Sequence, residues 1–101
     1  MAAKLVIIKQ VRSTLDVPFF RLNDEQKQLL KDAGTVASIG ERLFARGFKK
    51  LRTLFFPTVE LYDAWEANET IQALTAARAA YNTEKGIIER KVVIDLPGYT
   101  L

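Results

Sequence analysis

Residues 51–72, with the sequence LRTLFFPTVELYDAWEANETIQ, change from a strand pattern to a helix pattern partway along and decide the fold. The first six residues place apolar side chains on both sides of an extended chain, as a strand covered on two faces does. Pro57 ends this strand because proline has no N–H to donate to a sheet. Thr58 is a preferred N-cap residue, so a helix is predicted to begin directly after it.

The apolar residues after Thr58 form two stripes that do not line up on one straight helix. At about 100° per residue, Leu61 and Trp65 share one side, whereas Ile71 and the apolar residues that follow it point to another. A straight helix would therefore leave one stripe in solvent. A bend or short break is predicted at residues 67–69, where Asn68 can cap a restarted helix.

The other elements follow from shorter patterns. Strands are predicted over Lys4–Arg12, Thr35–Phe44, Lys49–Phe56 and Ile87–Leu96, and the first helix over Asp24–Ala33. Asn23 is its predicted N-cap, with Gln26 at the reciprocal capping position. Gly34 and Gly86 are predicted left-handed caps that close the two helical segments. The turn ARGF, residues 45–48, is expected to use a positive φ at its glycine, and Gly40 to mark a bulge or a close backbone approach.

The order strand, helix, strand, strand, helix, strand is the split βαβ pattern of ferredoxin-like proteins. We therefore predict one α+β domain over residues 1–101, with a four-stranded antiparallel sheet and two helices on one face. The other face is expected to be apolar, because Leu5–Ile8 does not alternate and the strand ending at Phe56 is apolar on both sides. Exposing such a face costs ~25 cal/mol per Å² and usually marks an interface. A homodimer that closes sheet against sheet is the expected assembly.

The segments LRTLFFPTVELYDAWEAN and ARAAYNTEKGI, together with the order of elements, resemble the dimeric α+β barrel superfamily. That superfamily includes antibiotic-biosynthesis-type monooxygenases and many small uncharacterised proteins. The resemblance runs over about residues 4–96 and is carried by Phe56, Thr58, Glu60, Tyr62, Trp65, Tyr81, Asn82, Gly86 and Ile87. It implies the fold and the homodimer, but not one activity, because one fold serves many functions. Relatives that degrade haem depend on a histidine that this chain lacks.

The absence of cysteine and histidine excludes several chemistries. Disulfides, Fe–S clusters and cysteine nucleophiles need cysteine, and structural zinc sites, His-ligated haem and the Ser-His-Asp triad need residues missing here. Oxygen ligands could still hold Mg²⁺ or Ca²⁺, but no acidic loop motif is present, so no metal and no cofactor is expected. The apolar run Leu5–Ile8 is too short for a signal peptide or a membrane span, so a cytoplasmic location is expected.

Five residues are predicted to line a ligand pocket: Phe19, Phe20, Arg52, Tyr62 and Trp65. Each has a plainer alternative. Trp65 is expected more often to pack in the core than to face a substrate, and the two phenylalanines can form the lip of a pocket or plug the end of a barrel. Arg52 shares a strand face with apolar residues, and a charge there needs a partner. It is predicted to anchor an acidic ligand or to form half of an intersubunit ion pair.

A basic group around the predicted hairpin comprises Arg42, Arg46, Lys49, Lys50 and Arg52. Such a group can contact nucleic acid or another anion. The glycine-aromatic signature of an RNA-recognition module is absent, and the net charge of +3 is modest, so a solvated hairpin is favoured over nucleic acid. Three functions stay open: binding of a small apolar or aromatic ligand, cofactor-independent monooxygenase activity involving Trp65 and Asn68, and anion or nucleic-acid binding through the hairpin. No catalytic residue can be named.

Overall fold

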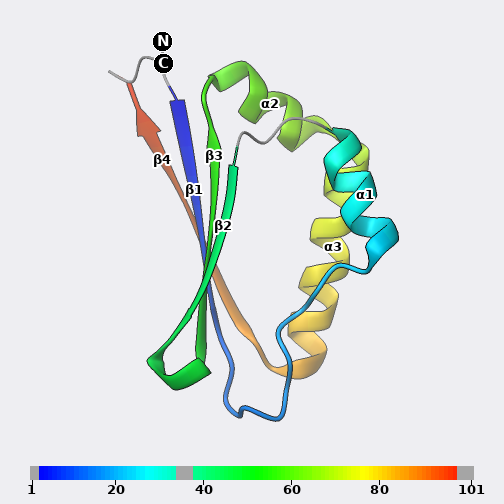
Figure 1. The fold of residues 1–101 in the computed structure, drawn as a ribbon, viewed down its shortest axis with the longest axis vertical. Helices are drawn as coiled ribbons and strands as arrows, with labels where there is room; N and C mark the ends of the chain where they lie inside the picture. The colour runs from blue at the N-terminus through cyan, green and yellow to red at the C-terminus, as the bar shows by residue number, and fades with distance from the viewer. Residues whose placement is uncertain (1–2, 34–37, 98–101) are drawn as a thin grey trace.

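The computed structural model describes residues 3–33 and 38–97, which form a four-stranded antiparallel sheet with helices on one face (Figure 1). The elements in chain order are β1 (Ala3–Val11), α1 (Asp24–Ala33), β2 (Ser38–Phe44), the 3₁₀ turn η1 (Ala45–Gly47), β3 (Lys49–Phe56), α2 (Val59–Ala67), α3 (Glu69–Lys85) and β4 (Ile88–Leu96). The strands lie in the order β2-β3-β1-β4, and all neighbours pair antiparallel. This order and connectivity confirm the predicted ferredoxin-like α+β fold.

The predicted element boundaries agree with the structure to within about a residue wherever residues are described. β3 and α1 match their predicted ranges, β1 is shifted by one residue, and β4 begins at Ile88. Ile87 falls outside β4 because its N–H donates to the carbonyl oxygen of Asn82 at 2.9 Å, closing the preceding helix instead. The predicted cap at Gly34, the strand start at residues 35–37 and the tail at residues 98–101 lie outside the described residues.

The predicted break in the second helix is present at Asn68, so the sheet carries three helices and not two. The backbone of Asn68 is extended (φ −72°, ψ 122°), and its side-chain oxygen accepts the N–H of Ile71 at 3.1 Å. The break lets Trp65 on α2 and Ile71 on α3 both reach the core, where both are buried. The mismatch between the two apolar stripes is thus resolved by changing the helix direction.

The remaining caps follow the predicted side-chain chemistry. Asn23 and Gln26 form a reciprocal capping box, with bonds of 2.8 and 2.9 Å. Thr58 accepts the N–H of Leu61 at 3.2 Å and starts α2. Gly86 ends α3 in the left-handed conformation at φ 70°. Gly40 marks a close approach, because a Cβ there would lie 2.9 Å from Oγ1 of its cross-strand partner.

The two faces of the sheet differ sharply in exposure. The helix-covered face carries the core, built on Val6, Ile8, Leu54 and Phe56 with Trp65 and Ile71 from the helices. The other face, which we call the open face, is largely apolar: Ile88 is 62% exposed and Val92 55%. The predicted bare apolar face is present, and the homodimer inferred from it stays a prediction. Across residues 3–33 and 38–97, no helix is long and apolar enough to cross a membrane.

Helix α1 stands apart from the sheet and packs chiefly against α3 (Figure 1). Its sequence explains this position, because most of its ten residues are polar and Leu30 is the one described α1 residue packed against the core. A helix with so narrow an apolar stripe has little reason to close onto β2. A space therefore remains between α1, β2 and the loop that connects β1 to α1.

Candidate ligand-binding pocket

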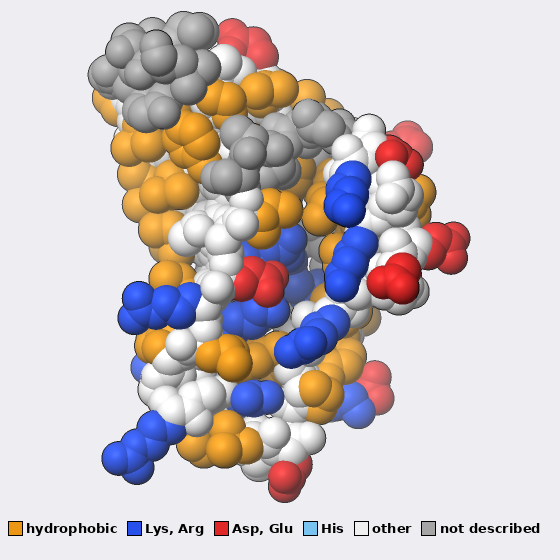
Figure 2. Space-filling model, viewed as in Figure 1, with side chains coloured by type: hydrophobic (Ala, Val, Ile, Leu, Met, Phe, Trp, Pro, Cys, Tyr) orange, Lys and Arg blue, Asp and Glu red, His pale blue; other side chains and the backbone are white. Residues whose placement is uncertain are grey.

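A cavity with a volume of about 610 Å³ lies between α1, the loop of residues 12–23 and the helix-covered face of β2 and β3. Figure 2 shows it as a hollow beside α1, with Lys or Arg and Asp or Glu side chains inside. Its apolar wall comprises Pro18, Phe19, Phe20, Leu22, Leu30, Ile39 and Leu43, and its polar lining comprises Gln10, Arg12, Arg21, Lys27, Glu41, Arg42, Lys50, Arg52 and Arg78.

Strand register explains why charged residues reach the inside of the fold. Directly opposed residues in an antiparallel sheet point to the same face. Arg52 on β3 lies opposite Ile8 on β1 and Glu41 on β2, and Lys50 lies opposite Gln10. The helix-covered face is therefore apolar at the α2 end and becomes charged toward η1, which is the part that α1 leaves uncovered.

Arg12 fixes the shape of the loop that walls the cavity. Its Nε donates to the carbonyl oxygen of Gly47 and its Nη1 to that of Val17, both at 2.9 Å. The same guanidinium lies 4.4 Å from the ring centre of Phe19, a cation–π contact. Phe19 is consequently buried although it belongs to a loop without regular structure.

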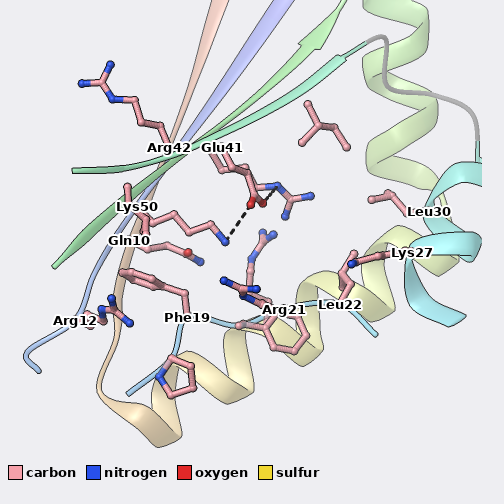
Figure 3. Close-up of a pocket in the computed structure, with 16 residues that line it drawn as sticks. Gln10, Arg12, Phe19, Arg21, Leu22, Lys27, Leu30, Glu41, Arg42 and Lys50 are labelled. Atoms are coloured by element: carbon pink, nitrogen blue, oxygen red, sulfur yellow. Dashed lines mark ion pairs between the residues drawn. The ribbon is translucent and has the colours of Figure 1, made fainter. Parts of the chain in front are cut away.

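Phe20 is placed by α3. The hydroxyl of Tyr81 donates to the carbonyl oxygen of Pro18, and the ring of Tyr81 lies 5.5 Å from that of Phe20. Phe19 and Phe20 therefore both form part of the cavity wall. Figure 3 shows Phe19 with Lys50 and Arg12 around the same space.

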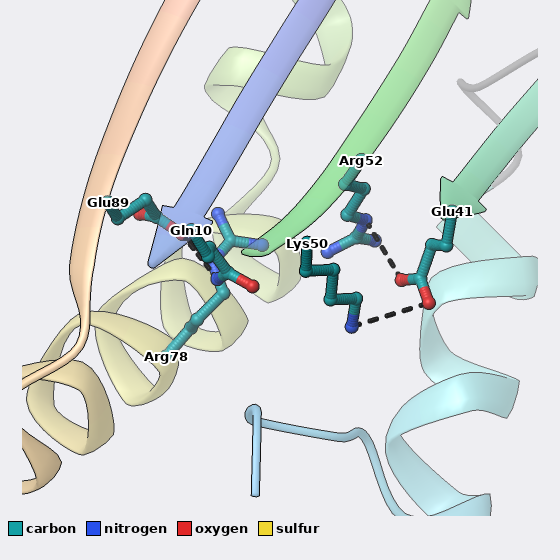
Figure 4. A network of polar contacts seen from close by, with 6 residues as sticks. All are labelled: Gln10, Glu41, Lys50, Arg52, Arg78 and Glu89. Carbon is teal, nitrogen blue, oxygen red and sulfur yellow. Dashed lines mark hydrogen bonds and ion pairs between the residues drawn. The ribbon is translucent and has the colours of Figure 1, made fainter. Parts of the chain in front are cut away.

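Glu89 on β4 is the counter-ion of Arg78, one of the residues that line the cavity (Figure 4). Its Oε1 accepts the side-chain amide of Gln10 at 2.8 Å, lies 3.0 Å from Nε of Arg78, and is 3.5 Å from the amide nitrogen of Asn82. The Arg78 contact is an ion pair by distance, but its Nε–H does not point along a hydrogen bond. Glu89 is held from three sides and neutralises chiefly Arg78.

Arg52 is neutralised less completely. Its Nε lies 3.7 Å from Glu41, too long for a hydrogen bond, and this buried nitrogen has no hydrogen-bond partner among the described residues. Burial lowers the pKa of Arg52, and the nearby charge of Arg78 lowers it further; Glu41 and Glu89 offset only part of this. Lys50 contacts the same Glu41 at 3.3 Å. The cavity thus contains a buried cation whose charge is poorly compensated.

Trp65 and Tyr62, the two other predicted pocket residues, lie away from the large cavity. Trp65 is 7% exposed and packs against Phe56, with ring centres 5.3 Å apart. It shares with Arg52 only a gap of about 20 Å³, space for about one water molecule. Tyr62 packs edge-on against Phe56 at 5.5 Å and lines neither space. The structure therefore brings together three of the five predicted residues, Phe19, Phe20 and Arg52.

The basic group predicted around the hairpin is divided between the two faces of the sheet. Lys50 and Arg52 point into the cavity, whereas Lys49 lies over the ring of Phe44 on the open face. Arg42 borders the cavity, but its side chain extends away from the other lining residues (Figure 3). Arg52 faces the helices, so it cannot form an ion pair across the open face. The alternation of β-strand side chains is the cause.

Arg78, Gln10 and Glu89 are functional candidates that the sequence did not indicate. The sequence could have indicated Glu41, because a turn at residues 45–47 places it opposite Arg52 across the hairpin. No sequence pattern could have indicated Arg78, because its approach to the sheet depends on how α3 packs. Among the described residues, no group of acidic side chains is arranged to hold a metal ion.

No protein-family model and no curated protein matches the chain. Three solved structures resemble it. One, from Chloroflexus aurantiacus J-10-fl, is named for a proposed antibiotic biosynthesis monooxygenase activity (13% identity, 96% of this chain and 97% of that chain, TM-score 0.48). The others are Rv0793 from Mycobacterium tuberculosis (12%, 97% and 97%, TM-score 0.45) and a dimeric protein of unknown function and ferredoxin-like fold from Bacteroides fragilis NCTC 9343 (12%, 97% and 96%, TM-score 0.45). At these identities and TM-scores, no activity carries over to this chain.

Proposed function

We propose that this protein binds a small ligand with an apolar or aromatic body in the cavity between α1, the loop of residues 12–23 and the sheet. The observation that carries the proposal is the cavity itself. Its volume of about 610 Å³ falls within the roughly 300–1,000 Å³ typical of small-molecule sites. Phe19, Phe20, Leu22 and Leu30 supply an apolar wall, and a few polar groups converge at the inner end.

The two other functions are less well supported by the geometry. A monooxygenase that uses Trp65 would need this ring and a polar side chain to face a substrate-sized space together. Trp65 is packed in the core, and Asn68 is occupied in capping α3. Binding of nucleic acid through the hairpin would need the basic residues on one surface, and the two faces of the sheet divide them.

A neutral polarity-sensitive dye, N-phenyl-1-naphthylamine, tests the proposed pocket directly. Its fluorescence should rise saturably on titration with the protein. Leu43 lines the cavity, is exposed, and lies outside the packed core, so Leu43→Trp should fill the space without disturbing the fold. The dissociation constant should rise about tenfold or more, since the dye loses most of its apolar contact.

The matched control places the same side chain on α1, outside the cavity. Leu29 is an exposed apolar residue that does not line the cavity, so Leu29→Trp should leave the dissociation constant unchanged. A dissociation constant that changes with Ile88→Trp on the open face and stays the same with Leu43→Trp would place the apolar site on the open face and refute the proposed pocket.

We propose in addition that two chains associate through their open faces. The support is the exposed apolar surface formed by Ile88, Val92 and Ile94 on β4, beside Ile7 on β1. Sedimentation velocity at micromolar concentration should give a dimer, and Val92→Arg should give a monomer because it buries unpaired charges in the interface. Leu29→Arg, at an exposed apolar residue of α1, is the control and should remain dimeric. A monomeric parent protein would rule this assembly out.

A further inference from the structure

The lining of the cavity carries more positive charge than its own carboxylate neutralises. Six cationic side chains of the described residues, apart from Arg42, line it: Arg12, Arg21, Lys27, Lys50, Arg52 and Arg78. Glu41 is the one carboxylate among the described lining residues, whereas the whole chain carries a net charge of only +3. Positive charge is thus concentrated where the molecule is hollow. Low-dielectric walls focus such a field and attract anions.

The two carboxylates near these cations are held very differently (Figure 4). Glu89 is 24% exposed and accepts at 2.8 Å from Gln10, so it is part of the packed structure. Glu41 is 48% exposed, lies on the edge strand β2, and touches Lys50 and Arg52 only at 3.3 and 3.7 Å. Charge-assisted hydrogen bonds are normally about 2.7–2.9 Å long. Glu41 therefore contacts both cations loosely and can turn toward solvent at little cost.

We propose that the ligand of this pocket is an amphiphilic organic anion, whose carboxylate or phosphate group replaces Glu41 on Lys50 and Arg52. This inference rests on the proposed function, because the apolar body of the ligand occupies the same cavity. Glu41 then acts as an internal counter-ion that keeps the empty pocket neutralised and competes with the ligand.

The arrangement of the walls suits such a molecule. Phe19 lies between the cations, with Arg12 at 4.4 Å and Lys50 at 6.0 Å from its ring centre, so an apolar surface adjoins the anion site. A guanidinium can bind a carboxylate or a phosphate through two parallel hydrogen bonds. The buried Nε of Arg52 has no hydrogen-bond partner among the described residues and lies 3.7 Å from the carboxylate of Glu41, so an anion that takes the place of Glu41 comes next to it.

Two dyes with the same anilinonaphthalene body separate the anionic contribution from the apolar one. N-phenyl-1-naphthylamine is neutral, and 8-anilinonaphthalene-1-sulfonate carries one negative charge. The parent protein should bind the sulfonate dye about tenfold or more tightly than the neutral dye, as expected for hydrogen bonds to charged groups. Arg52→Met should abolish this preference because the sulfonate dye loses its anchoring cation, whereas the neutral dye, which makes no ion pair, should still bind.

Glu41→Gln tests the role of Glu41 through the direction in which the affinity for the sulfonate dye changes. Removal of the internal competitor should raise the affinity for the sulfonate dye several-fold and leave the neutral dye unaffected. Glu84 is an exposed carboxylate that pairs only loosely with Lys85, so Glu84→Gln controls for the change in net charge and should alter neither affinity. A decrease or no change for Glu41→Gln would overturn the role assigned to Glu41.

Displacement of the bound sulfonate dye identifies the anionic group. Competition by 1-naphthoate indicates a carboxylate ligand, and stronger competition by 1-naphthyl phosphate indicates a phosphate ligand; the neutral methyl ester of 1-naphthoate should displace the dye poorly. Equal affinities for the two dyes in the parent protein, with binding still blocked by Leu43→Trp, would overturn the anion inference and leave the proposed pocket standing. Dissociation constants of both dyes that Leu43→Trp leaves unchanged would instead refute the pocket itself.

Discussion

Replacement of Arg52 by methionine is expected to make the protein more stable. Arg52 lies on β3 among apolar neighbours, with Leu54 beside it on the same face and Trp65 across a small gap. Its side chain is 16% exposed, and its one close anionic contact among residues 3–33 and 38–97 is the 3.7 Å pair with Glu41. Methionine keeps the apolar stem of the arginine and removes the charge.

The change in the free energy of unfolding has two contributions: the ion pair that is lost and the burial of a cation that is avoided. The lost ion pair involves a half-exposed carboxylate at long distance, so it contributes between zero and about 1 kcal/mol. Glu41 also keeps Lys50 as a partner. The gain is the removed cost of burying a cation, and replacing buried ion pairs by well-packed apolar residues commonly stabilises by about 1–4 kcal/mol. We expect Arg52→Met to raise the free energy of unfolding by about 1–3 kcal/mol.

Urea denaturation followed by circular dichroism measures this change, with parent and variant at the same protein concentration because the proposed association would also contribute to stability. Each 1 kcal/mol should raise the melting temperature by about 4–8 °C in a domain of this size. Arg78→Met is the contrasting variant. It leaves the partly buried Glu89 without its cation, so it should destabilise by about 1–3 kcal/mol. Arg52→Met less stable by 1 kcal/mol or more would refute the view that Arg52 is poorly compensated.

Three further substitutions test the fold. Asn68→Ala removes the acceptor for the Ile71 N–H and should cost about 1 kcal/mol by urea denaturation; no change would show that packing alone sets the break. Phe56→Ala empties the fully buried centre of the core and should cost about 3–5 kcal/mol, and a loss below 1 kcal/mol would contradict this. Gly86→Ala forces a side chain into φ 70° and should lower stability by about 1 kcal/mol, measured as a lower melting temperature, whereas Gly86→Asn should be milder.

Most of the fold could be predicted because its signals are local. The Thr58 cap, the break at Asn68 and the capping box of Asn23 each depend on residues within a few positions of one another. The ferredoxin-like order then follows from the sequence of elements. The break is the clearest case, since two apolar stripes on one chain segment can both be buried only if the helix changes direction.

The candidate site was harder to predict because non-local packing forms it. The sequence could pair Glu41 with Arg52 once the turn was placed, but it gave no indication that α1 would stand away from β2. Nor could it place Arg78, whose approach depends on the rotation of α3. Trp65 was included among the pocket residues because cofactor-independent monooxygenases use tryptophan around an aromatic substrate, whereas the structure packs it against Phe56 in the core.

The position of Arg52 makes sense only if stability and binding make opposite demands on the same residue. An apolar side chain at this position on β3 would extend the core of Leu54 and Phe56 toward η1. The chain instead has a cation there, with Lys50 two residues before it and a loosely held Glu41 opposite. Natural proteins commonly accept such a local cost at the site where they bind a ligand. Arg52→Met should therefore separate the two demands, because it raises stability in the absence of ligand and lowers affinity for the anionic dye in the same protein.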